Sequence, residues 1–359
     1  MNGDHVKLYI PGPIEVSEDT YKAMSAPMIG HRSKDFVNLY EQIQPMLQSL
    51  CGTKQPVFLS TSSAWGVMEA SIRNLVSKKV LNCCCGAFSD KWLDVSIRCG
   101  KQAESLQVEW GQPIDPAALE QKLSTGDFDT VTLVHNETST GVANPLSELA
   151  GVVKKFPEVL LVVDTVSSFS AVPISVDDLG IDVLLTGSQK ALALPPGLSL
   201  FTVSEKAMAR ASEMPDRGYY FDFLEFEKNA LKSMTPSTPC ISLLHGLAWR
   251  LEQIRSEGET NRYSRHEKLN AMVHKWVKDN GFEHFAPEGY RSKTLTCVLN
   301  NREIDVPGWI RSMREKHSLV INGGYGKIKG KTFRISNMGD ETEESISAML
   351  EVLSDTLPD

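Results

Sequence analysis

An α/β fold with a mainly parallel sheet is the structure that this sequence predicts, with a smaller α+β unit at its C-terminal end. From about residue 55 to residue 205, short apolar runs alternate with stretches of helical periodicity. The apolar runs lack strict polar alternation, as expected for strands that are covered on both faces. The 359 residues, of which 41% are hydrophobic, suffice for one large and one smaller domain.

Six apolar runs are predicted to be strands of the main sheet, and helices are predicted between them. The strands are expected at residues 56–59, 80–83, 130–134, 159–163, 183–185 and 198–203, and the helices at 64–75, 89–99, 116–124 and 145–155. This order of elements is typical of crossover units, which build a parallel sheet.

The rest of the chain is predicted to be first irregular and then helical. Pro236 and Pro239 break any helix in the stretch from about 215 to 240, because proline lacks a backbone donor. Long helices are expected at 241–280, then strands at 295–299 and 332–335 with helices near 305–317 and 341–354. We therefore expect a large domain at 15–255 and a small domain at 256–359, with residues 1–14 contributing to the active site or to the small domain.

Composition disfavours several classes of protein. The net charge of −8 gives no general attraction to nucleic acid or to an anionic membrane. We expect neither a signal peptide nor a membrane span, because the first residues lack a basic region followed by an apolar run and no apolar run reaches 18 residues. Seven cysteines, three of them consecutive at 83–85, favour a reducing, cytoplasmic location over a disulfide framework, and no cysteine or histidine spacing predicts a metal site.

Two charged residues follow predicted strands. Lys190 lies just beyond the run 183–185, and Asp164 ends the run 159–163. The carboxyl ends of parallel strands share the edge where open α/β sheets bind ligands. Alone, Lys190 is better explained as an exposed residue, whereas Asp164 is equally explained as a partnered carboxylate. Together they are the two protein groups that pyridoxal phosphate requires, an amine for a Schiff base and a carboxylate for the ring nitrogen.

Two more segments are expected at the same edge. Residues 60–66 join a predicted strand to a helix whose free N–H groups would favour an anion such as a phosphate, although a simple helix cap is the alternative. No glycine pattern of a dinucleotide site or a P-loop accompanies them. Residues 135–141 follow the run 130–134, and their polar side chains could also only cap the next helix.

Three motifs resemble one known family. They are His135-Asn136-Glu137-Thr138-x-Thr140-Gly141-Val142, Val163-Asp164-x-Val166-Ser167-Ser168 and Thr186-Gly187-Ser188-Gln189-Lys190-Ala191-Leu192. Their order and spacing strongly resemble class V (subgroup IV) pyridoxal-phosphate aminotransferases, in the alanine–glyoxylate and serine–glyoxylate (serine–pyruvate) branch. The resemblance runs from Pro11-Gly12-Pro13 to Phe333-Arg334-Ile335. It implies the type I aspartate aminotransferase fold, with a seven-stranded, mainly parallel sheet, and a homodimer with active sites at the subunit interface.

The resemblance also implies roles for single residues. Lys190 would form the Schiff base with the cofactor and move the substrate proton, Asp164 would keep the pyridine nitrogen protonated, and Arg334 would bind the substrate carboxylate. Other cofactor contacts are implied for Ser63, Ala64, Trp65 and Gln189 at the phosphate, Phe88 and Val166 at the ring faces, Thr138 at the ring oxygen and Thr238 from the neighbouring subunit. Substrate contacts are implied for Gly12, His31 and Arg32.

The function expected from this resemblance is transfer of an amino group from serine or alanine to glyoxylate or pyruvate by a ping-pong route. His31 and Arg32 leave an alternative open, since a similar pair in phosphoserine aminotransferases binds the distal phosphate, so the substrate could be phosphoserine or aspartate. The pair could equally only stabilise the dimer or the entry segment. A cysteine desulfurase is disfavoured because Cys297 lies within a predicted strand, and a non-catalytic cofactor binder is a further alternative.

Overall fold

The structure, a computed structural model, describes residues 5–358. Its main sheet has seven strands in the order β2–β10–β9–β8–β5–β3–β4. Of these, β10 pairs antiparallel with β2 and β9, while the other pairs are parallel, so six strands run in one direction. The strands are β2 (Phe58–Ser60), β3 (Lys79–Cys84), β4 (Gln102–Gln107), β5 (Thr130–Val134), β8 (Leu160–Asp164), β9 (Val183–Gly187) and β10 (Ser199–Val203).

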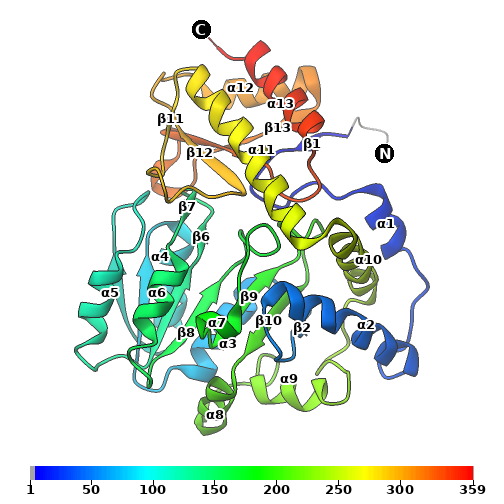
Figure 1. The fold of residues 1–359 in the computed structure, drawn as a ribbon, viewed down its shortest axis with the longest axis vertical. Coiled ribbons are helices and arrows are strands. Elements are labelled where there is room, and N and C mark those ends of the chain that lie inside the picture. Colours follow the sequence, from blue (N-terminus) through cyan, green and yellow to red (C-terminus); the bar gives the residue numbers. More distant parts are fainter. Residues whose placement is uncertain (1–4, 359) are drawn as a thin grey trace.

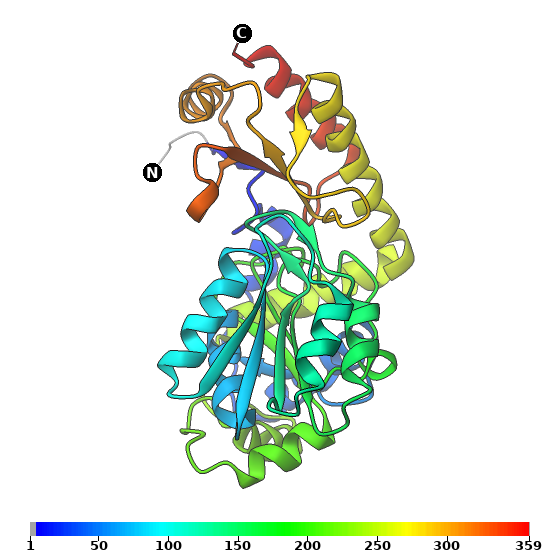
Figure 2. The same ribbon diagram turned by 90° about the vertical axis from the view of Figure 1, so that its left-hand side faces the viewer.

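Helices cover both faces of this sheet (Figures 1 and 2). They are α2 (Lys34–Cys51), α3 (Ala64–Leu75), α4 (Ala87–Arg98), α5 (Pro116–Leu123), α6 (Leu146–Val153), α8 (Glu205–Glu213), α9 (Phe223–Ala230) and α10 (Ile241–Glu257), with the shorter α1 (Glu18–Met24) and α7 (Val176–Leu179). In β8, Leu161 and Val163 pack in one core with α2, α5, α6 and α10, whereas Leu160 and Val162 pack in the other with α3, α4, α8 and α9. Both sides of β8 are therefore apolar, which explains its lack of polar alternation.

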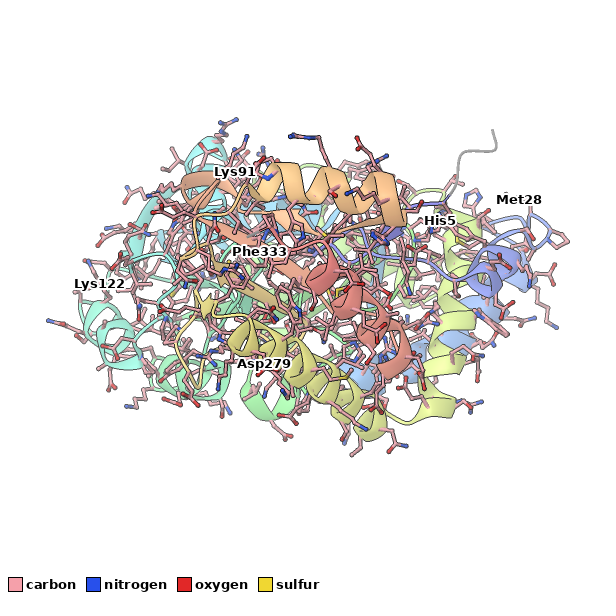
Figure 3. The ribbon with its side chains drawn as sticks, turned by 90° about the horizontal axis from the view of Figure 1, so that it is seen from above. His5, Met28, Lys91, Lys122, Asp279 and Phe333 are labelled. Atoms are coloured by element: carbon pink, nitrogen blue, oxygen red, sulfur yellow. The ribbon has the colours of Figure 1, made fainter. Side chains whose placement is uncertain are left out.

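A second, smaller unit has its own sheet and core. Its antiparallel sheet has the order β11–β12–β15–β14, and α11, α12 and α13 accompany it at the top of Figure 1. The elements are α11 (Glu259–Asp279), β11 (Glu283–His284), β12 (Leu295–Leu299), α12 (Val306–His317), β14 (Asn322–Gly323), the 3-10 turn η1 (Gly326–Ile328), β15 (Thr332–Ser336) and α13 (Glu343–Asp355). Phe333 lies in its core with Trp276 and Trp309, and Figure 3 shows it between Met28 and Lys122 at opposite ends of the molecule.

The N-terminal segment crosses from the small unit to the main sheet. Strand β1 (Lys7–Leu8) pairs in parallel with β13 (Leu319–Val320), and Tyr9 N donates to Val320 O at 2.9 Å. Five residues later Ile14 N donates to Gln189 O at 3.2 Å. The segment therefore passes directly beside Lys190. The domain division at 255/256 stays a prediction, although α10 and α11 meet near it at Gly258.

Several elements differ from the sequence-based expectations. Strand β4 is missing from them because its sequence, QAESLQ, is polar and only one neighbour, β3, pairs with it at the sheet edge. Helix α9 lies inside the stretch predicted to be irregular, where Asp222 caps it by accepting a bond from Leu224 N. The hairpin of β6 (Asn136–Glu137) and β7 (Val142–Ala143) is also absent from the predicted elements. Within residues 5–358, no helix has the length and apolar character needed to cross a bilayer.

Candidate active site

Lys190 lies in a buried turn between β9 and β10. It follows β9 and is 8% exposed, and its Nζ donates to the carbonyl oxygen of Pro11. Gly12 packs so closely that a Cβ there would lie 2.8 Å from Cδ and Cε of Lys190, and its φ of +133° also favours glycine. The N-terminal segment therefore forms one wall around this amine.

Burial changes the charge state of Lys190. Loss of water contact, together with the positive charge of Arg334, lowers the pKa of its amine to about 7. Asp164 and Glu137 act in the opposite direction by favouring the ammonium form. The amine is thus available in its neutral, nucleophilic form near neutral pH.

Asp164 ends β8 at the same sheet edge and is 6% exposed. Burial raises the pKa of its carboxyl to about 7, and the bond that Oδ1 accepts from Val166 N at 2.7 Å opposes this rise. Within residues 5–358 this is the single hydrogen bond that reaches the carboxylate. A buried carboxylate with one oxygen unpaired suits a cationic partner such as a protonated ring nitrogen.

The turn after β2 leads into the N-terminus of α3. Ser63 occupies the cap position, but its side chain makes no capping hydrogen bond, and Ala64 and Trp65 form the first turn. Behind them, Ser62 Oγ lies 2.8 Å from Ser199 Oγ and thereby ties the turn to β10. The first N–H groups of α3 are consequently available to an anion at the carboxyl edge of the sheet.

Glu137 is a site residue to which the sequence assigned no role. It is fully buried, and its carboxylate accepts bonds from Phe88 N at 3.3 Å and Ser89 N at 3.0 Å, at the start of α4. It also accepts bonds from the hydroxyls of Ser89 at 3.0 Å and Ser139 at 2.7 Å. The cap residue of α4 is a glycine, which has no side chain to accept a hydrogen bond. Glu137 on β6 supplies the acceptor in its place, and thereby fixes the position of Phe88. The sequence feature that could have indicated this role is an acidic residue shortly after the predicted strand at 130–134.

Two hydrogen bonds join Thr138, Arg334 and the turn that follows Asp164. The Thr138 hydroxyl hydrogen-bonds that of Ser167, next to the half-buried Val166. Arg334, on β15 of the small unit, donates from Nη1 to Thr138 O at 3.2 Å and from Nε to Gly323 O at 3.2 Å. It is 5% exposed, and burial lowers the pKa of its guanidinium. The small unit thus places the Arg334 guanidinium next to Thr138, beside the edge of the main sheet.

The residues His31, Arg32 and Thr238 form a separate cluster. Arg32 donates to Thr235 O at 2.9 Å and to Pro236 O at 3.1 Å, and His31 Nε2 lies 3.4 Å from the Thr238 hydroxyl. Within the described part of the chain, no hydrogen bond or ion pair connects this cluster to Lys190 or Arg334. The substrate role of His31 and Arg32 therefore stays a prediction.

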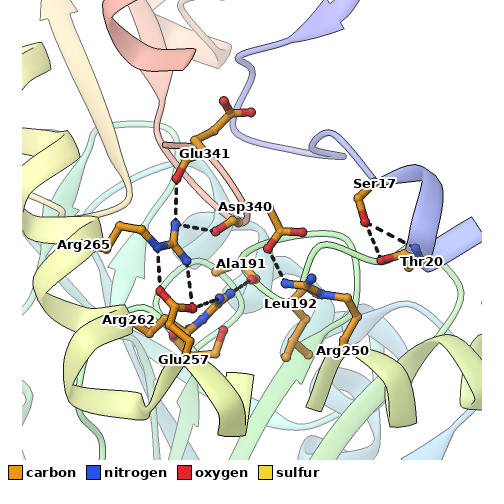
Figure 4. A network of polar contacts seen from close by, with 12 residues as sticks. Ser17, Thr20, Ala191, Leu192, Arg250, Glu257, Arg262, Arg265, Asp340 and Glu341 are labelled. Atoms are coloured by element: carbon orange, nitrogen blue, oxygen red, sulfur yellow. Dashed lines mark hydrogen bonds and ion pairs between the residues drawn. The ribbon is translucent and has the colours of Figure 1, made fainter. Parts of the chain in front are cut away.

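A network of arginines holds the segment after Lys190 (Figure 4). Arg262, 1% exposed on α11, donates to Ser170 O at 2.9 Å and to Ala191 O, and pairs with Glu257 at 3.1 Å. Arg250 on α10 donates to Leu192 O at 3.1 Å. These bonds connect the helices at the junction of the two units to the turn that carries the site lysine.

Replacing Arg262 with methionine is expected to lower the free energy of unfolding by about 3 kcal/mol, because buried carbonyl groups and Glu257 lose their partner. Urea unfolding at fixed protein concentration measures the change. The control is Arg255→Met, whose side chain is 71% exposed and pairs with Glu252 one turn away, and which should change stability little. Equal effects of both substitutions would contradict a structural role for the buried network.

The residues present fit pyridoxal phosphate. The uncapped N-terminus of α3 can bind a phosphate, the unpaired oxygen of Asp164 can meet a ring nitrogen, and the near-neutral Lys190 can react with an aldehyde. All three lie at the carboxyl edge of strands that run in one direction. Such a site on this fold defines a pyridoxal-phosphate enzyme of the aminotransferase class.

Comparison with known proteins identifies the family. Residues 15–308 match the class-V aminotransferase family, so this chain belongs to the class-V aminotransferases, enzymes that use pyridoxal phosphate. An uncharacterised aminotransferase of Methanocaldococcus jannaschii is 38% identical, covering 98% of this chain and 92% of the relative. The serine–glyoxylate aminotransferase of Methylorubrum extorquens is 32% identical, covering 94% of this chain and 88% of the relative.

A solved structure confirms the fold expected from the sequence. The alanine–glyoxylate aminotransferase of Nostoc superposes with a TM-score of 0.95 at 29% identity, covering 100% of this chain and 97% of that one. The chain therefore has the type I aminotransferase fold, with the seven-stranded sheet that the resemblance implied.

Proposed function

We propose that this chain transfers an amino group from serine or alanine to glyoxylate or pyruvate in two half-reactions, as a cytoplasmic homodimer. The observation that carries the proposal is the convergence of Lys190, Asp164 and Arg334, all buried, at one edge of the sheet. The serine–glyoxylate and alanine–glyoxylate activities in the names of the relatives support a small donor and a small 2-oxo acid. Seven free cysteines agree with a reducing compartment.

Each of the three residues has a distinct task in this proposal. Bound pyridoxal phosphate supplies an electron-accepting ring next to the substrate. Arg334 binds the α-carboxylate through its planar guanidinium and so directs the substrate Cα toward Lys190. Lys190, neutral above about pH 7, takes the proton from Cα and returns it as a general acid. Asp164 as an anion stabilises the proton on the ring nitrogen.

The rate at which cofactor-free protein takes up pyridoxal phosphate is expected to increase with pH through about 7 and then level off. The lowered pKa of Lys190 is the reason, since the amine is protonated and unreactive below that pH and neutral above it. Stopped-flow absorbance of the bound cofactor measures the rate. An ordinary lysine, with a pKa of 10.5, would instead give a rate that keeps rising about tenfold per pH unit beyond pH 9.

The separate cluster of His31, Arg32 and Thr238 supports the proposed dimer. It lies on a loop beside the phosphate turn, since Cys240 N donates to Thr61 Oγ1 at 3.1 Å. Aromatic and apolar side chains are exposed nearby on the chain, with Tyr219 at 66% and Leu231 at 81%. Such exposure is typical of a surface that a second subunit covers. The cluster would then serve the phosphate site of the partner.

The alternatives are less well supported. Arg32 is engaged with two loop carbonyls, which leaves it poorly placed to bind a side-chain anion of phosphoserine or aspartate. A desulfurase needs a reactive thiolate, whereas Cys297 is 3% exposed and burial raises the pKa of its thiol to about 12. A non-catalytic binder would not need the lowered pKa of Lys190.

Absorption spectroscopy of the loaded protein tests this function. L-serine or L-alanine is expected to convert the visible band of the bound cofactor to the shorter-wavelength band of its amino form, and glyoxylate or pyruvate should restore it. A response to L-aspartate or O-phospho-L-serine alone would replace the proposed donors by anionic ones. A loaded protein whose band responds to no amino acid would overturn the transaminase proposal.

A further inference from the structure

A short segment of the small unit reaches over the start of α4. Between β14 and β15, Lys327 Nζ lies 3.3 Å from Asp90 Oδ2 and 4.9 Å from the ring centroid of Trp110. Trp110 Nε1 also donates to Asp90 at 3.0 Å. At Gly326, with φ of +57°, an added Cβ would lie 2.9 Å from the Trp110 ring. These contacts hold the segment against the main unit, and thereby fix the preceding residue, Tyr325.

Tyr325 contacts two residues of the site. Its ring stacks on Phe88 with a centroid distance of 5.7 Å and an interplanar angle of 13°. The guanidinium carbon of Arg334 lies over the same ring at 5.6 Å from its centroid. Tyr325 is nevertheless 49% exposed, so folding of the core alone does not account for an aromatic residue here. Its ring therefore lies directly beside the guanidinium to which the proposed function assigns the substrate carboxylate.

A cavity of about 330 Å³ adjoins this aromatic pair. Phe88 and Tyr325 form one wall, and Trp65, Ala87 and Val95 contribute apolar surface. Lys91, labelled in Figure 3, and Glu69 also line it. The cavity is large enough for a branched or aromatic side chain, and the Tyr325 ring stands at its edge beside Arg334.

We propose that Tyr325 determines donor specificity by closing the substrate site on the side of this cavity, which restricts the donor to side chains the size of serine or alanine. The inference rests on the proposed function, in which Arg334 binds the α-carboxylate. Consider a donor whose α-carboxylate is bound by Arg334 and whose side chain has at least three carbons more than that of alanine. Its side chain would have to occupy the volume of the Tyr325 ring. Without the ring, the apolar cavity would receive the longer side chain and gain from its burial.

Two variants test the inference. Tyr325→Ala is expected to raise the kcat/KM for L-leucine relative to that for L-alanine by at least about 10-fold. Tyr325→Phe keeps the ring and should leave this ratio unchanged. Single-turnover absorbance changes of the loaded protein give both constants. An unchanged ratio in Tyr325→Ala, with a normal cofactor band and unfolding midpoint, would overturn the proposal.

A second measurement does not depend on catalysis. Propionate and 4-methylpentanoate are the amine-free analogues of alanine and leucine, and calorimetry measures their affinities for the loaded protein. The quantity compared is the affinity for 4-methylpentanoate divided by the affinity for propionate. In Tyr325→Ala this ratio is expected to be at least about 10-fold higher than in wild type or in Tyr325→Phe. If no amino acid reacts but this shift is found, the transaminase proposal fails while the role of Tyr325 stands. If amino acids react but neither ratio shifts, Tyr325 does not set specificity.

Discussion

Lys190→Ala is expected to lower the rate of the amino-donor half-reaction by about 10³-fold or more and to remove the visible band of covalently bound cofactor. Lys190 provides the Schiff-base amine and, once released, the group that moves the substrate proton. No other lysine can replace it, because the buried amine is positioned by Pro11 and by the close approach of Gly12. Single-turnover absorbance measurements with L-serine and L-alanine give the rate.

Lys275→Ala is the matched control for this substitution. Its side chain is 76% exposed and pairs with Asp279 on α11, so its removal should leave both the band and the rate unchanged. Far-UV circular dichroism confirms that the Lys190 variant is folded. A folded Lys190→Ala protein that retains the visible band and more than a tenth of the rate would assign the chemistry to another residue.

Asp164→Asn is expected to reduce the rate of the same half-reaction by about 10²- to 10³-fold while leaving cofactor binding detectable. The amide has the shape of the carboxyl and can still accept the hydrogen bond from Val166 N. It lacks the negative charge that stabilises a protonated ring nitrogen, so the ring accepts electrons less readily. Single-turnover rates at saturating donor separate this effect from weaker binding.

Asp182→Asn is the control for Asp164→Asn. Asp182 is a buried carboxylate beside the opposite, amino-terminal end of β9, where it accepts a bond from Leu161 N at 2.9 Å. Its substitution should lower stability and leave the rate per folded molecule unchanged. Equal losses of rate in both variants would mean that Asp164 acts through folding and not at the cofactor.

Local sequence patterns were sufficient for the strands that are buried on both faces. The runs at 130–134 and 159–163 match β5 and β8 because every residue in them is buried and most of them are apolar. The sequence did not predict edge strand β4 or helix α9, because neither has a long apolar pattern. The polar residues of β4 face solvent, and the helical stretch of α9 is short and lies between proline- and glycine-containing loops.

The polar residues around the site show the same contrast. Lys190 and Asp164 could be placed from the sequence because strands that run in parallel end at the same edge of the sheet. Glu137 could not be assigned its task, since its partners on α4 lie about 50 residues earlier in the chain. Local sequence patterns also could not predict that Arg32 and His31 contact the loop at 235–238.

By itself, the sequence determined the class of fold, the family motifs and the edge of the sheet at which Lys190 and Asp164 meet, because side-chain periodicity and strand direction are local properties. The tertiary structure alone decided that Pro11 faces Lys190, that Arg334 reaches Thr138 and that Tyr325 stacks on Phe88. These contacts join residues up to 237 positions apart across the two units. They depend on how the small unit packs against the main sheet, which no local pattern encodes.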